Sequence, residues 1–459
     1  MSEITYQEFM EKRDKYTNDI LSSDSTKKVI LAGPGTGKSH LFKQVCKDNL
    51  VKGKDKNLAL SFINELVNEL RKDLYGLAEV HTLHSFAKSL FPGVNKMSMK
   101  LCEIIKDEYS IFTGLDVDFK EILCKMLTAD KELSFFSKRR KYYRSVGPDC
   151  TIYGLIKYWE VNPNKIPSYS QILVDEYQDF NKLEITFIDM LSQKSPILVV
   201  GDDDQSLYDF KYALPDIIRE RYSDGSYSSF SLPFCSRCTR VITDAFNSFV
   251  NKAKENGFLK TRADKEFLYF PSKDKDKISE ENPKIIVNTK IFDSKISYCI
   301  ENEIKNIYNN YEKDFTVLII CPLKDQILRL SKALRKKGFV DVREPKSENF
   351  SYLVEGFKLL LEDKDSNLGW RIVSKELIQE SDNSNFKTIL ENTISDPTLL
   401  FKEVVKKIDK DLFKKIRFIR AGLNKIINNN EIKEEDFNQI RDVFKIDKLA
   451  MLSIYLKKF

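Results

Sequence analysis

The chain has 459 residues, a length that predicts two or more domains, each able to bury a sizeable core. Its 75 basic and 69 acidic side chains leave a net charge of only +6, so bulk charge does not by itself indicate a nucleic-acid partner. No apolar run approaches the roughly 18 residues that cross a membrane, and the polar N-terminus is unlike a signal peptide, which predicts a cytoplasmic protein without a membrane partner.

The eight cysteines form no disulfide-rich pattern. Cys235 and Cys238 make one CxxC pair, but no second pair and no nearby histidine completes a tetrahedral zinc site. We therefore interpret them as reduced cysteines.

The first predicted element is a short strand at Val29–Leu31, followed by a glycine-rich segment and a helical pattern from His40 to Asn49. The segment fits Walker A spacing, with Ala32 at the first glycine position. Glycines permit positive φ and let backbone N–H groups close on phosphates, and the helix N-terminus adds its positive end. We expect a nucleotide-binding loop formed by Gly33, Pro34, Gly35, Thr36, Gly37, Lys38 and Ser39. Its lysine is expected to reach the β- and γ-phosphates, and its serine to hold Mg²⁺.

Further strands are predicted at Leu58–Phe62 and Val80–Leu83, each followed by a helical pattern. This alternation is typical of a parallel β-sheet. Between about residues 91 and 164 the apolar residues recur at helical spacing, which predicts a helical insertion, and the sheet resumes at Ile172 and Ile197.

Two adjacent carboxylates, Asp175 and Glu176, follow the apolar strand that begins at Ile172. In a P-loop ATPase one acid at this place binds Mg²⁺, and the next lies beside the attacking water. Because a phosphate loop lies upstream, we expect Asp175 to share a metal with Ser39 and Glu176 to be catalytic.

A second α/β unit is predicted after Pro233, with strands at Ile285–Val287 and Thr316–Cys321. The segment Lys273–Asn282 is rich in charged residues and serine and is predicted to be a loop. From about Tyr352 to the end the pattern is helical.

Taken together, these motifs resemble a superfamily 1 helicase of the UvrD/Rep/PcrA type. The string Asp175–Asp179 matches that family's Walker B signature, and Leu198–Tyr208 resembles its third motif. Ser61–Asn64 and Thr82–Phe86 resemble its two motifs that contact single-stranded DNA. The resemblance covers roughly the first half of the chain and implies an α/β P-loop NTPase with tandem RecA-like domains and helical insertions.

The same resemblance implies roles for further residues. Gln205 matches the glutamine that senses the γ-phosphate and couples it to DNA. Arg237 matches the nucleotide-binding arginine that approaches the γ-phosphate from the second domain. The catalytic set is therefore expected to be Glu176, Gln205, Arg237 and Lys38, with ATP and Mg²⁺ as cofactors. The family's single-strand track, on which bases stack without sequence readout, is matched by Phe62, Asn64, Thr82, His84, Tyr208, Phe210 and Lys211.

The chain departs from the family pattern in two places. In the fourth motif Ser236 replaces the tyrosine that stacks on adenine, and Phe234 is a candidate substitute from a shifted position. The fifth and sixth motifs, which would supply a second arginine, are not found between Pro283 and Phe459. We therefore expect a fragment, a natural short form, or a site that a partner chain completes.

The predicted organisation is a first RecA-like ATP-binding domain at 1–90, a helical insertion at 91–165, the first domain continued at 166–232, an incomplete second RecA-like domain at 233–350, and its helical insertion at 351–459. The leading prediction is an ATP-dependent DNA translocase or helicase, 3′→5′ by resemblance, acting on single-stranded DNA or a single/double-strand junction. The alternative is an ATP- and DNA-binding helicase-like subunit, weakly active alone, that works with a partner such as a nuclease in DNA repair or phage defence.

Overall fold

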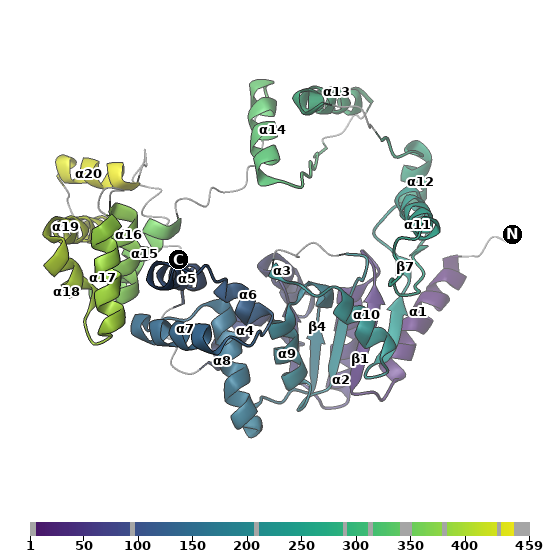
Figure 1. The fold of residues 1–459 in the computed structure, drawn as a ribbon. Coiled ribbons are helices and arrows are strands. Elements are labelled where there is room, and N and C mark those ends of the chain that lie inside the picture. Colours follow the sequence, from purple (N-terminus) through teal and green to yellow (C-terminus); the bar gives the residue numbers. More distant parts are fainter. Residues whose placement is uncertain are drawn as a thin grey trace. The chain divides into compact units, whose positions relative to one another are not determined.

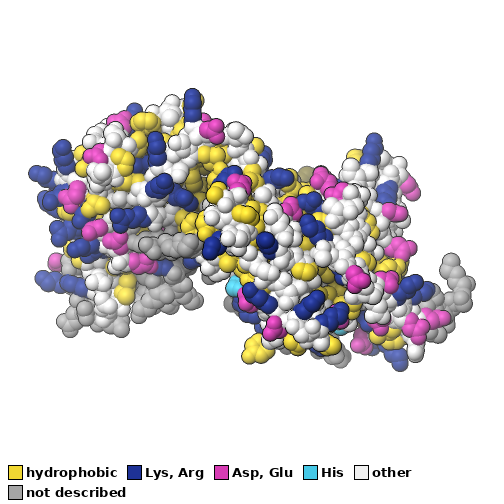
Figure 2. Space-filling view, turned by 90° about the horizontal axis from the view of Figure 1, so that it is seen from below, with side chains coloured by type: hydrophobic (Ala, Val, Ile, Leu, Met, Phe, Trp, Pro, Cys, Tyr) yellow, Lys and Arg dark blue, Asp and Glu magenta, His cyan; other side chains and the backbone are white. Residues whose placement is uncertain are grey.

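The computed structural model describes residues 6–91, 97–205, 211–287, 292–310, 315–339, 351–378, 383–428 and 433–444. By its contacts the chain divides into two compact units, Met1–Ile285 with Lys387–Leu399, and Ile286–Phe386 with Leu400–Phe459. Within the described ranges, no helix combines the length and the apolar character needed to cross a bilayer. Basic and acidic side chains are interspersed over the face drawn in Figure 2.

The first unit is built on a six-stranded parallel sheet (Figure 1). Its strands are β1 (Lys27–Ala32), β2 (Asn57–Ser61), β3 (Glu79–Thr82), β4 (Gln171–Val174), β5 (Ile197–Gly201) and β6 (Ser228–Leu232). Their order is β3-β2-β4-β5-β1-β6, and every pairing is parallel. The five predicted strands of this sheet are confirmed, and the phosphate loop follows a strand that has neighbours on both sides.

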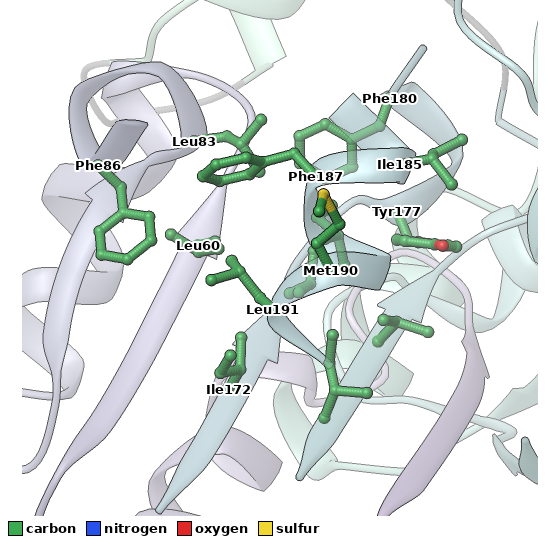
Figure 3. Packing of buried hydrophobic residues seen from close by; sticks show 14 of the residues in the cluster. Leu60, Leu83, Phe86, Ile172, Tyr177, Phe180, Ile185, Phe187, Met190 and Leu191 are labelled. Atoms are coloured by element: carbon green, nitrogen blue, oxygen red, sulfur yellow. The ribbon is translucent and has the colours of Figure 1, made fainter. Parts of the chain in front are cut away.

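Two layers of helices bury the faces of this sheet, because successive strand residues point to opposite sides. Val29 and Leu31 belong to one buried cluster, and Ile30 and Ala32 belong to the other. Figure 3 shows part of the first cluster, in which side chains from β2, α4 and α9 come together. The helices of this part are α1 (Tyr6–Ser22), α2 (Lys38–Val51), α3 (Asn64–Asp73), α4 (Leu83–Leu90), α9 (Lys182–Leu191) and α10 (Asp216–Ser223), with the 3₁₀ turns η1 (Pro163–Lys165) and η2 (Tyr177–Asp179).

The described residues of the predicted helical insertion are mainly helical, as their apolar spacing predicts. The insertion consists of α5 (Leu101–Thr113), α6 (Phe119–Cys124), α7 (Asp130–Tyr143) and α8 (Pro148–Val161). A buried ion pair lies inside it: Arg139 Nε donates to Glu108 Oε2 at 2.7 Å, with the two side chains 3% and 0% exposed. Tyr143 donates to the other carboxylate oxygen, and the Arg139 Nη1 group donates to the Thr393 carbonyl at 3.1 Å.

Removing only one member of this pair is expected to destabilise the first unit strongly. Arg139→Ala leaves the Glu108 carboxylate buried without its cation, which typically costs about 3–5 kcal/mol. Denaturant unfolding is the measurement, with the neighbour Lys138→Ala as control. The double variant Glu108→Gln/Arg139→Met removes both charges and should recover part of the loss; equal stability of Arg139→Ala and the parent would contradict this expectation.

The segment after β6 belongs by its contacts to the first unit up to Ile285, so the unit boundary lies well beyond the predicted domain start at residue 233. It contains β7 (Phe234–Cys235) paired in parallel with β8 (Leu268–Tyr269), and the helices α11 (Arg240–Glu255) and α12 (Lys273–Glu281). The loop predicted at Lys273–Asn282 is wrong, because α12 occupies it. Ser272 caps this helix by accepting from the Lys275 N–H, and acidic residues in its first turn favour the helix dipole.

In the described part of the second unit, all regular secondary structure is helical. Its helices are α13 (Asp293–Asn310), α14 (Lys324–Lys336), α15 (Ser351–Glu362), α16 (Asn367–Leu377), α18 (Phe401–Ile408), α19 (Lys410–Ile427) and α20 (Glu434–Phe444). Helix α17 (Asn383–Ser395) is divided between the two units by its contacts. The helical pattern predicted after Tyr352 is confirmed where the chain is described.

The strands predicted at Ile285–Val287 and Thr316–Cys321 are not formed. Most of their side chains are exposed, as Ile286 at 74% and Leu318 at 84% illustrate. A β-branched run has strand propensity, but a strand is stable only where a neighbouring strand takes its hydrogen bonds. No such neighbour pairs with either segment within the described part of the chain.

Candidate functional site

The glycine-rich loop joins β1 to α2 at the carboxyl end of the sheet. Gly35 and Gly37 have φ of +71° and +94°, a conformation that a residue with a Cβ rarely adopts, and Gly37 is the N-cap of α2. The Thr36 hydroxyl closes the turn by donating to the Gly33 carbonyl at 2.9 Å. Because a helix N-terminus and a positive-φ turn meet here, the loop has the shape of an anion cradle.

Lys38, the first residue of α2, lies against both predicted acids. Its Nζ donates to Glu176 Oε1 at 2.6 Å and lies 4.0 Å from Asp175 Oδ1. Burial alone would lower the pKa of Lys38, but the charges of Asp175 and Glu176 outweigh it and raise this pKa. The structure therefore brings the predicted Walker A lysine and Walker B carboxylates together.

The two carboxylates leave β4 in a constrained geometry. Burial, followed by the charge of Glu176, raises the pKa of Asp175 to about 6. Glu176 has φ of +51°, which is strained for a residue with a side chain, and its N–H donates to Asp175 Oδ1 at 3.0 Å. A cation would stabilise the ionised Asp175, so the donor set of Ser39, Asp175 and the loop fits a magnesium–nucleotide complex.

Polar side chains connect Glu176 to the loop after β5. Gln178 donates to Glu176 Oε2 at 2.9 Å and accepts from the Asp202 N–H at 3.1 Å. Gln205 in turn donates to Asp202 Oδ2 at 2.9 Å, so Gln205 is joined to Glu176, the predicted catalytic carboxylate, through two residues. Neither Gln178 nor Asp202 was a predicted site residue, although both lie inside the matched motifs.

A cavity of about 150 Å³ lies beside this connection. Its lining includes Glu176 and Gln205 on the polar side and Phe62 on the apolar side, with the remainder formed by Ile63, Leu66, Gln178 and Asp179. The cavity therefore joins the predicted ATP-hydrolysing residues to the first predicted DNA-stacking aromatic.

The segment that contains Arg237 packs directly on the phosphate loop. The Ser236 N–H donates to the Gly35 carbonyl at 2.9 Å, and the Cys235 thiol donates to the Pro34 carbonyl at 3.2 Å. A Cβ built on Gly35 would lie 2.3 Å from Arg237 Cβ. Arg237 thus lies in the first unit, and the expectation that it belongs to a separate second domain is not what this structure shows.

Phe234, the suggested substitute for the adenine-stacking tyrosine, is buried in a cluster of rings. It packs edge-on against Phe9, Tyr16 and Phe270 at centroid distances of 6.1, 6.1 and 6.2 Å. A ring enclosed in this way offers no open face to a base, so the structure does not support that substitution.

Gly35→Ala should disrupt the phosphate loop through a steric clash in addition to backbone strain. The substitution places a methyl group against Arg237 at a positive φ, whereas Gly53 has the same φ of +71° with nothing within 4 Å of a built Cβ. Gly53→Ala should cost about 1–2 kcal/mol of stability without changing nucleotide affinity. Gly35→Ala should cost more stability, measured by thermal unfolding, and should abolish Mg-ATP binding, measured by calorimetry. Equal stability and equal nucleotide affinity of the two variants would contradict the close packing of Arg237 on Gly35.

The predicted DNA-contacting residues lie in different environments. Phe62 is half-buried, contacts Phe180 edge-on at 5.6 Å, and has Lys211 Nζ 4.3 Å from its ring centroid. Asn64 is exposed at the start of α3. Tyr208 and Phe210 lie outside the described residues.

Thr82 and His84 have structural partners. Thr82 is the N-cap of α4, where its hydroxyl accepts from the Ser85 N–H at 3.1 Å. His84 Nε2 lies 3.1 Å from Glu184 Oε1; burial would lower the pKa of this histidine, but the Glu184 carboxylate outweighs it and raises the pKa. Capping and ion pairing therefore account for both side chains without DNA, and their DNA role remains a prediction.

Comparison with known proteins places a family model, described as an AAA domain, at residues 18–211. The chain is 22% identical over 281 residues to DNA helicase II of Haemophilus influenzae, and the aligned region covers 48% of this chain and 38% of that protein. It is 31% identical over 146 residues to ATP-dependent DNA helicase PcrA of Leuconostoc citreum (30% and 19% covered). It is 35% identical over 104 residues to a subunit of the ATP-dependent helicase/nuclease of Ruminiclostridium cellulolyticum (20% and 8% covered).

The chain thus spans well under half the length of each of these three relatives. The matched region contains the phosphate loop, the paired carboxylates and the loop after β5 whose geometry is given above. Residues 18–211 accordingly match the AAA domain model, and the chain is similar to helicases of the UvrD-like superfamily 1 type.

Proposed function

We propose that the chain binds Mg-ATP at the β1–α2 loop and hydrolyses it as part of a DNA translocase or helicase. The observation that carries the proposal is the contact of Lys38 with Glu176 and Asp175, joined through Gln178 and Asp202 to Gln205. A P-loop, a pair of Walker B acids and a glutamine in contact are the parts that phosphoryl transfer to water requires.

Each residue has a role that follows from its position. Lys38 would leave its carboxylate partners for the β- and γ-phosphates, and Ser39 and Asp175 would hold the metal. Bound Mg²⁺ would neutralise charge on the phosphate oxygens. Glu176, freed from its lysine, would orient a water molecule and accept its proton. Arg237, already beside the loop, would stabilise charge at the transferred phosphoryl group.

We further propose single-stranded DNA as the track, in line with the names of the helicase relatives. The half-buried Phe62 and the adjacent Lys211 combine an aromatic ring with a basic group, the two elements of sequence-independent strand binding. Because Phe62 lines the same cavity as Glu176 and Gln205, a strand at Phe62 has a short route to the hydrolytic residues.

Phe62→Ala should weaken binding of a fluorescent single-stranded oligonucleotide by about 1–3 kcal/mol, the usual contribution of one stacked base. Fluorescence anisotropy is the measurement, and Phe258→Ala, at an exposed turn after α11, is the matched control. Parent-like affinity of Phe62→Ala would remove this residue from the strand site, and absence of binding by the parent would overturn the proposed track.

A partner-dependent subunit is the second candidate. Two observations favour it: the similarity to subunits of ATP-dependent helicase/nucleases, and the exposed apolar segments at Ile285–Val287 and Thr316–Cys321. In this case the chain would bind nucleotide and strand but hydrolyse ATP slowly until a partner, such as a nuclease, completes the site.

A further inference from the structure

Three consecutive aspartates follow β5, immediately after Gly201. Carboxylate oxygens of Asp202, Asp203 and Asp204 lie within 4.8 Å of one another, and all three side chains are at most 9% exposed. Three buried carboxylates at this separation repel one another unless cations compensate them. In this structure the compensation comes from the chain itself.

Lys265 lies at the centre of the triplet. Its Nζ contacts Asp202 Oδ1 and Asp203 Oδ1, and lies 3.1 Å from Asp204 Oδ2, while its own side chain is only 5% exposed. Two arginines complete the network from the outside. Arg262 donates twice to Asp204, at 2.8 and 3.0 Å, and Arg219 donates to Asp203 at 3.1 Å. Among these three cations, Lys265 is the one that contacts all three aspartates.

The segment that carries Lys265 also contacts the phosphate loop. Two residues further on, the Phe267 ring lies against Gly33, where a built Cβ would be 2.9 Å from the ring. The Ala263 N–H donates to Asp203 Oδ2 at 2.9 Å and fixes the other end of the segment. Residues 262–267 therefore connect the aspartate triplet to the loop that surrounds the phosphates.

Asp202 links this network to Gln205. One of its oxygens contacts Lys265, and the other accepts from the Gln205 amide at 2.9 Å. The Asp202 carboxylate is therefore shared between Lys265 and Gln205. Losing Lys265 leaves Asp202 without its cation and removes the fixed acceptor that orients the glutamine.

We infer that Lys265 is a positioning residue, which acts through Asp202 to hold Gln205 toward the terminal phosphate of a bound nucleotide. The inference rests on the proposed function, because it requires nucleotide at the β1–α2 loop. A purely structural lysine would affect all nucleotides alike, whereas a residue that positions Gln205 affects only nucleotides with a γ-phosphate.

The test compares binding of Mg-ADP and of the non-hydrolysable Mg-AMPPNP by calorimetry. The parent should prefer AMPPNP. Lys265→Met should lose most of the preference for AMPPNP, while its affinity for ADP stays within about twofold of the parent's. Gln205→Ala should behave in the same way. The double variant Lys265→Met/Gln205→Ala should lose no more of the preference than either single variant. Lys260→Met, at an exposed lysine two residues before this segment, should behave like the parent.

The outcomes separate the inference from the proposed function. A parent that binds neither nucleotide overturns the proposed function and the inference together. If the parent prefers AMPPNP and Lys265→Met keeps the same preference, the inference alone is overturned. The same holds if Lys265→Met loses affinity for both nucleotides equally. If Lys265→Met does not fold, Lys265→Met/Asp203→Asn restores the charge balance and is measured instead; retained preference in that variant also overturns the inference.

Discussion

Lys38→Ala should abolish Mg-ATP binding. Backbone amides of the loop cannot replace the lysine charge at the β- and γ-phosphates, and the substitution also leaves Asp175 and Glu176 facing the incoming phosphates without a cation. Burial and the charge of Glu176 raise the pKa of Asp175, and the charge of Lys38 offsets part of this rise. Loss of Lys38 should therefore make that carboxyl harder still to ionise for a metal.

Calorimetry with Mg-ATP measures this effect. Lys43→Ala is the matched control, because Lys43 is exposed on the same helix α2. The control should bind like the parent. Unchanged affinity in Lys38→Ala would show that the phosphates bind elsewhere.

Glu176→Gln should bind ATP and fail to hydrolyse it. The amide keeps the size of the carboxylate and can still accept from Lys38, but it cannot take a proton from water. Loss of a general base typically lowers turnover by about 10²–10⁴-fold. The expected result is parent-like affinity by calorimetry with phosphate release reduced to that extent.

One contact limits how conservative this substitution is. Gln178 now donates to Glu176 Oε2, and an amide at position 176 offers either a donor or an acceptor there, depending on its orientation. Gln178→Ala is therefore the companion variant: it removes the same contact and keeps the base. If Glu176→Gln turns over like the parent, another residue activates the water.

Much of the fold and of the candidate nucleotide site could be predicted from the sequence, because the residues of both lie in short, contiguous motifs. The apolar runs at Val29–Leu31 and from Ile172 are strands buried on both faces, and the loop residues Gly35 and Gly37 have the positive φ that glycine permits. β6 was missed because its residues, Ser-Ser-Phe-Ser-Leu, lack an apolar run; it lies at the sheet edge beside β1.

The remaining differences arise from contacts between residues distant in sequence. The packing of Arg237 on Gly35 depends on how the chain after β6 returns to the phosphate loop, which no spacing shows. Lys265 is one of many lysines in the sequence, and only the structure shows it buried among three aspartates. The runs at Ile285–Val287 and Thr316–Cys321 have strand propensity, but no neighbouring strand is paired with them where the chain is described.

Residues 1–459 should contain a working nucleotide site that responds to a DNA strand. Steady-state ATP hydrolysis by this chain, with and without single-stranded DNA, is the decisive measurement. We expect slow, Mg²⁺-dependent hydrolysis that single-stranded DNA accelerates, without processive unwinding. Arg237 is predicted to act without the second arginine of the family's sixth motif, and loss of one arginine finger can cost about 10³–10⁵-fold in phosphoryl transfer. Hydrolysis that is undetectable under both conditions, or that Lys38→Ala leaves unchanged, would show that the β1–α2 loop is not a working nucleotide site.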